Sequence, residues 1–219
     1  MKILLLCRPV VIILFGMFFS SNVMANPSTS YEGYELFNKY CSICHGEGGK
    51  GNGLLAKKIE KPPADLTNNK ILSKRTDEDL IRIVEGTLPH GTKASDMPNW
   101  RYVLPGSQIR SLVVYIRFLH RGKNALPGDP GLGKKVYDNY CTQCHGTYGK
   151  GHGILTKVYT MDPVDHSDAA RMDKIKNKKL RSIITDGGTD SSLMPGWGGI
   201  LTKDEIDAVI SYIRLIAAH

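Results

Sequence analysis

The 219-residue sequence contains no run of alternating apolar and polar residues long enough to form a β-sheet. Cysteine is also scarce: Cys7 stands alone, and the other four fall in two short clusters, at 41–44 and 141–144. The longest run of apolar residues and glycine, Val10 to Phe19, is too short for a membrane-spanning helix of about twenty residues. The first of these absences excludes a β-rich protein and predicts an all-α fold.

Residues 1–25 have the pattern of a Sec-type signal peptide. Lys2 and Arg8 supply a positive segment, the apolar run follows, and Val23-Met24-Ala25 fits a cleavage site made of small residues. An uncleaved membrane anchor is the alternative, although the apolar run is short for that purpose. We therefore predict export to the periplasm.

The two cysteine clusters share one motif, Cys-x-x-Cys-His, which is the attachment signature of c-type haem. Two thiols at this spacing can add to the two vinyl groups of one haem, and the adjacent histidine then lies under the iron. One copy alone could instead be a redox dithiol or half of a zinc site. Two copies predict two covalent haems c, attached through Cys41 and Cys44, and through Cys141 and Cys144. No cysteine of the mature chain then remains for a disulfide or a thiolate ligand.

The segments around the motifs also repeat, at an offset that falls from one hundred to ninety-seven residues. The glycine-rich loop 46–55 matches 146–155, Met97-Pro98-Asn99-Trp100 matches Met194-Pro195-Gly196-Trp197, and Tyr115-Ile116-Arg117 matches Tyr212-Ile213-Arg214. A period this long suits two similar small domains in tandem.

With a Met-Pro pair about fifty residues after each haem motif and a closing amphipathic helix, the chain resembles a di-haem class I cytochrome c. The resemblance implies an exported electron carrier built from two fused domains, at 26–126 and 127–219. A linker rich in proline and glycine, Leu126 to Gly131, separates them. Similar domain pairs also occur as subunits of terminal oxidases and dehydrogenases.

The axial ligands follow from the motifs and the methionine count. His45 and His145 are the predicted proximal ligands. Met97 is the only methionine of the first mature half, and the repeat selects Met194 from three in the second half. We predict Met97 and Met194 as sixth ligands, with ordinary core packing as the alternative.

The other histidines are predicted to lie on the surface, because none has a partner at the matching position of the other half in a ligating context. They are His90, His120, His152, His166 and His219. The resemblance also implies that a proline carbonyl in the segment 61–66 accepts a hydrogen bond from the proximal histidine. The second half offers only Asp162-Pro163 for that role.

Helical patterns place the main elements of both halves. A helix is predicted from Gly33 to Tyr40, and a second follows the capping residue Thr76 and ends at Gly86. In the second half, helices are predicted over 178–185 and after the capping box at Thr202. The closing helices carry apolar stripes at helical spacing: Ile109, Leu112, Val113, Ile116 and Leu119 in one, and Ile206, Val209, Ile210, Ile213 and Ile216 in the other.

Positive charge is concentrated in the first half. Removing Lys2 and Arg8 lowers the net charge from +8 to +6, with fifteen basic and ten acidic residues in 26–126 and twelve and eleven in 127–219. This asymmetry favours an acidic redox partner at the first domain, or reflects ordinary solvated lysines. Nucleic acid is a poor candidate partner for an exported haem protein, and a membrane is reached only through a partner complex or an uncleaved leader.

Two functions from different classes fit these residues. The first is a periplasmic carrier that passes single electrons through two Met/His-ligated haems. The second is a haem enzyme, such as a peroxidase or a dehydrogenase subunit, with one open iron. The absence of an inserted catalytic segment and the methionine in each half favour the carrier.

Overall fold

The computed structural model describes residues 29–87, 97–122, 124–189 and 193–217. Within these ranges every regular element is a helix and no strand occurs, which confirms the all-α expectation. The predicted signal peptide, His90 and His219 lie outside the described residues. None of the helices described is long and apolar enough to cross a membrane.

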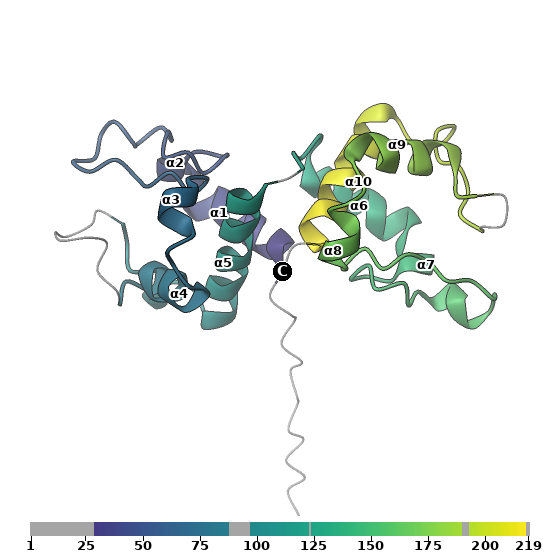
Figure 1. The fold of residues 1–219 in the computed structure, drawn as a ribbon, viewed down its shortest axis with the longest axis horizontal. Helices are drawn as coiled ribbons and strands as arrows, with labels where there is room; N and C mark the ends of the chain where they lie inside the picture. The colour runs from purple at the N-terminus through teal and green to yellow at the C-terminus, as the bar shows by residue number, and fades with distance from the viewer. Residues whose placement is uncertain (1–28, 88–96, 123, 190–192, 218–219) are drawn as a thin grey trace, which may run out of the picture.

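The helices form two similar sets (Figure 1). The first set comprises α1 (Ser30–Tyr40), α2 (Ser42–His45), α3 (Asn69–Leu72), α4 (Asp77–Glu85), the 3-10 helix η1 (Trp100–Tyr102) and α5 (Gly106–Arg121). The second set comprises α6 (Pro130–Tyr140), α7 (Thr142–His145), the 3-10 helix η2 (Ile154–Lys157), α8 (Ala169–Met172), α9 (Asn177–Asp186) and α10 (Lys203–Ile216).

Side-chain caps determine where several helices begin. Capping boxes open α4 at Thr76 and α10 at Thr202, as the sequence predicts. The hydroxyl of Thr29 accepts a hydrogen bond from the N–H of Glu32, so α1 begins three residues before the predicted start at Gly33.

The connection between the two sets is shorter than the proline and glycine content suggested. The carboxylate of Asp129 accepts a hydrogen bond of 2.8 Å from the N–H of Gly131, and α6 begins at Pro130. Proline suits the first helical position because its φ is already helical and it has no N–H to satisfy. Pro130 and Gly131 therefore belong to α6, and the predicted linker ends at Asp129.

In each set the first and last helices pack together at a glycine. A Cβ atom at Gly33 of α1 would collide with the carbonyl of Ser111 on α5, and one at Gly133 of α6 would collide with the carbonyl of Ala208 on α10. Only glycine permits this backbone approach. The apolar stripes predicted for the two closing helices are buried against these partners, except that Leu119 is only partly buried.

The two sets also contact each other, through α1 and α10. The rings of Tyr31 and Tyr212 meet edge to face, with centroids 5.0 Å apart, and these residues are 8% and 4% exposed. The short helices α2 and α7, which carry the haem motifs, lie on opposite sides of this contact (Figure 1). The helix pairs therefore stand between the two motifs.

We expect Tyr31→Ala to loosen the contact between the two sets, because an aromatic pair contributes about 0.5–1.5 kcal/mol beyond its buried area. Small-angle X-ray scattering should show a larger radius of gyration for this variant. Tyr31→Phe keeps the ring and loses only the hydroxyl bonded to Glu35, so it should scatter like the parent protein. An unchanged radius in Tyr31→Ala would show that other contacts hold the halves together.

Candidate haem-binding sites

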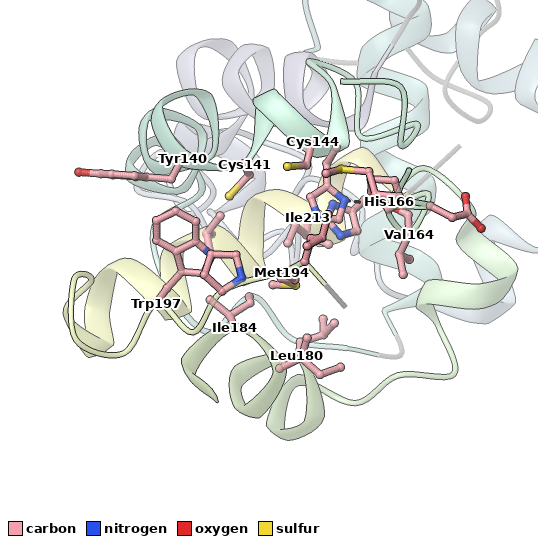
Figure 2. Close-up of a pocket in the computed structure, with 18 of the residues that line it drawn as sticks. Tyr140, Cys141, Cys144, Val164, His166, Leu180, Ile184, Met194, Trp197 and Ile213 are labelled. Atoms are coloured by element: carbon pink, nitrogen blue, oxygen red, sulfur yellow. Dashed lines mark hydrogen bonds between the residues drawn. The ribbon is translucent and has the colours of Figure 1, made fainter. Parts of the chain in front are cut away.

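The four site residues predicted for the second half line one cavity of about 410 Å³. They are Cys141, Cys144, His145 and Met194, and the remaining walls are mostly apolar. Figure 2 shows the two thiols on one side of this cavity and the sulfur of Met194 on another. Two segments about fifty residues apart in the sequence thus bring two thiols, an imidazole and a thioether to one cavity.

The donor set fits a c-type haem. Nδ1 of His145 lies 3.0 Å from the carbonyl oxygen of Val164, which only accepts, so Nδ1 carries the proton and Nε2 keeps its lone pair. Burial lowers the pKa of His145, so the imidazole is neutral near pH 7. A neutral imidazole held through its other nitrogen is the usual state of a metal-ligating histidine.

The same bond occurs in the first half, where Nδ1 of His45 lies 3.2 Å from the carbonyl oxygen of Ala64. The expectation of a proline acceptor is therefore wrong in both halves, because the acceptors are the carbonyls of Ala64 and Val164. Each of these residues directly follows a proline. The proline carbonyls point elsewhere: a Cβ atom at Gly51 would collide with the carbonyl of Pro63. Proline shapes the segment, and the next residue supplies the acceptor.

Other residues of the first site occupy matching places. Cys41, Met97 and Trp100 pack against the hydrophobic core. The ring centroids of Tyr40 and Trp100 lie 5.4 Å apart, as do those of Tyr140 and Trp197. Residues 88–96, which precede Met97, lie outside the described ranges.

Burial raises the pKa of the Cys41 and Cys141 thiols to about 12, so both are protonated at neutral pH. A redox dithiol needs an attacking cysteine whose pKa is lowered toward neutral. The raised pKa of the first thiol of each motif therefore argues against a redox dithiol, and no group of three or more His, Cys, Asp or Glu side chains able to hold a metal ion occurs among the described residues.

His166 is not a surface residue, so that expectation is wrong. Its ring stacks on His145, with centroids 4.1 Å apart and planes 16° apart, and it lines the cavity. The hydroxyl of Tyr137 lies 3.1 Å from its Nδ1, and burial holds the pKa of His166 well below the ordinary imidazole value. Alignment of the repeat could have revealed this, because position 166 matches the apolar Leu66.

The other described histidines and methionines lie on the surface, partly buried, in the core or at the cavity wall. His152 is exposed, as predicted, and His120 is half-buried, with Nε2 3.0 Å from Oδ1 of Asn69. Met161 and Met172 both line the same cavity as Met194, and Met172 is only 1% exposed and also packs in the core.

Comparisons with known proteins address the family. The model of "Cytochrome C oxidase, cbb3-type, subunit III" matches residues 30–116 and 128–213. The cbb3-type cytochrome c oxidase subunit FixPc of Rhizobium leguminosarum bv. viciae is 29% identical over 194 residues, which cover 83% of this chain and 59% of that protein. Cytochrome c6 of Gloeothece citriformis is 32% identical over 89 residues, 41% of this chain and 73% of that protein.

A solved chain of the reducing HAO-like protein complex of Kuenenia stuttgartiensis aligns with 84% of this chain and 95% of its own length, at 24% identity and a TM-score of 0.35. The chain spans 59% of the length of the FixPc relative. The chain belongs to the family of cytochrome c oxidase, cbb3-type, subunit III, with two tandem helical cytochrome c domains and two covalent haems c.

Proposed function

We propose that this chain passes single electrons through two His/Met-ligated haems and is not itself a catalyst. The observation that carries the proposal is the meeting of Cys141, Cys144, His145 and Met194 at one cavity. When bound, each haem supplies a one-electron iron couple. The cysteines would hold it covalently, and the histidine and methionine would occupy both axial positions of the iron.

The first site would use the matching residues: Cys41 and Cys44 for attachment, with His45 and Met97 as axial ligands. The support is the shared geometry around the proximal histidine, where a backbone carbonyl nineteen residues later fixes the ring in both halves. We place the boundary between the domains at 126/127, which agrees with the gap between the two matched ranges and with the start of α6 at Pro130.

The enzyme alternative requires an iron with an open axial position. A thioether on the same cavity as His145 argues against it, because Met194 can close the sixth position. Among the relatives, those named as cbb3-type oxidase subunits work within a complex. We infer a comparable role here as an electron-transfer subunit or carrier.

The domains would work on the periplasmic side, where the predicted leader would deliver them. Partners would be redox proteins. The fifteen basic and ten acidic residues of 26–126 favour an acidic partner surface at the first domain.

We expect the intact mass of the mature protein to exceed that of the polypeptide by two haems, even after acid extraction. The oxidised protein should show the red absorption band of Met–Fe(III) at the intensity of two haems. Carbon monoxide should leave the spectrum of the reduced protein unchanged, because both axial positions are filled. The double variant Cys141→Ala, Cys144→Ala should have an intact mass lower by one haem. Carbon monoxide binding by the reduced parent protein would instead favour the enzyme alternative.

A further inference from the structure

The two proximal sites differ in the polarity of one pair of side chains. In the second half, Tyr137 is fully buried and its hydroxyl lies 3.1 Å from Nδ1 of His166, whose ring stacks on His145. The matching positions of the first half hold Phe37, which is 1% exposed, and Leu66. One half thus has a polar pair behind the proximal ligand, and the other has an apolar pair.

The backbone around the pair is the same in both halves. The N–H of Leu66 donates to the carbonyl of Gly49 at 2.7 Å, and the N–H of His166 donates to the carbonyl of Gly149 at 2.6 Å. Each proximal histidine is fixed by a carbonyl nineteen residues later. The difference between the sites therefore lies in the side chains and not in the position of the chain.

A neutral imidazole and a phenol hydroxyl carry dipoles that an alkyl chain and a phenyl ring lack. Oxidation of a haem iron adds one positive charge, and burying charge among purely apolar groups costs free energy. Dipoles that can turn their negative ends toward the iron reduce that cost and stabilise the ferric state, which lowers the midpoint potential. Local polarity is one of the means by which a protein sets this potential.

We propose that the Tyr137–His166 pair holds the midpoint potential of the second haem below that of the first. The inference rests on the proposed function, in which His145 and Met194 ligate the second iron. Tyr137 and His166 are positioning residues here, since they act on the iron through His145. At equilibrium a single electron then resides on the first haem, in the more basic half of the chain.

The competing explanation is that Tyr137 and His166 only fill space in the core. Redox titration distinguishes this explanation from control of the midpoint potential. We expect His166→Leu to raise the lower of the two midpoint potentials and leave the upper one in place, so that the gap narrows. Tyr137→Phe should act in the same direction with a smaller shift. The double variant carries the residues that the first half already accommodates at these positions, so its packing has a precedent within this chain.

The reciprocal change provides a second test. Leu66→His together with Phe37→Tyr should lower the upper potential. His152→Leu, the same chemical change at an exposed position of the second half, should leave both potentials unchanged. The potential that moves in His166→Leu must also be the one that Met194→His moves, which assigns it to the second haem.

The intact mass of the protein and its Met–Fe(III) absorption band test the proposed function independently of this inference. A parent protein lacking two haems or the band contradicts the proposed function. With both present, unchanged potentials in His166→Leu, or a downward shift, overturn the inference alone. If His166→Leu fails to fold, Tyr137→Phe and the reciprocal variant decide. A shift of the midpoint potential with the expected sign supports the inference, and an unchanged potential overturns it.

Discussion

Replacing Met194 by histidine should lower one of the two midpoint potentials and leave the other nearly unchanged, and Met97→His should do the same for the other haem. A thioether is a weaker donor than imidazole, so it favours the reduced iron and raises the potential relative to bis-histidine ligation. Axial ligands move haem potentials over a range of about 0.8 V.

Redox titration of each variant, together with the Met–Fe(III) band, measures this effect. Each variant should retain half of the band. Met161→Leu is a matched control because Met161 lines the same cavity as Met194 but has no counterpart in the first half, where Lys61 stands. If Met194→His leaves both potentials and the band intact, Met194 is not the sixth ligand. If Met161→Leu removes half of the band, Met161 is the better candidate.

Local signals in the sequence were enough to predict most of the longer helices. The capping boxes at Thr76 and Thr202 are short-range interactions, because each cap and its partner lie three residues apart. The apolar stripes of α5 and α10 also depend only on spacing. Pro130 misled the prediction because proline marks both linkers and first turns of helices, and only the Asp129 cap distinguishes the two.

Features that depend on distant residues were missed. The stack of His166 on His145 requires segments twenty-one residues apart to meet, and the edge-to-face contact of Tyr31 with Tyr212 joins the two halves. A single histidine or tyrosine carries no local sign of such a partner. Comparing the two halves position by position would have helped to place His166, because the matching residue Leu66 is apolar and so indicates an interior site.

The repeated Tyr-Ile-Arg motif was recognised in the sequence without a role, and the structure supplies one. Arg214 of α10 is 3% exposed, and its guanidinium donates to Oδ1 of Asn177 at 2.9 Å, to the carbonyl of Met172 at 2.5 Å and to the carbonyl of Ile175. Arg117 of α5 likewise donates to backbone carbonyls, those of Leu72 and Arg75. Each arginine therefore links a closing helix by hydrogen bonds to the end of a short helix and the residues after it, at 72–75 in the first half and 172–175 in the second.

We expect Arg214→Met to lower the free energy of unfolding by about 2 kcal/mol or more, because each buried carbonyl left without a donor costs about 1–3 kcal/mol. Arg214→Lys should recover little of this loss, since an ammonium group cannot reproduce the fork of guanidinium donors. Denaturant unfolding of the haem-loaded protein measures the change.

Arg181→Met is the matched control. Arg181 is partly exposed and pairs with Asp207, and an ion pair of that kind contributes about 0–1 kcal/mol. Met172 and Ile175 also line the cavity, so the wall that Arg214 secures is a wall of the candidate haem site. If Arg214→Met unfolds at the same denaturant concentration as Arg181→Met, the carbonyls have found other donors, and the arginine does not hold this wall.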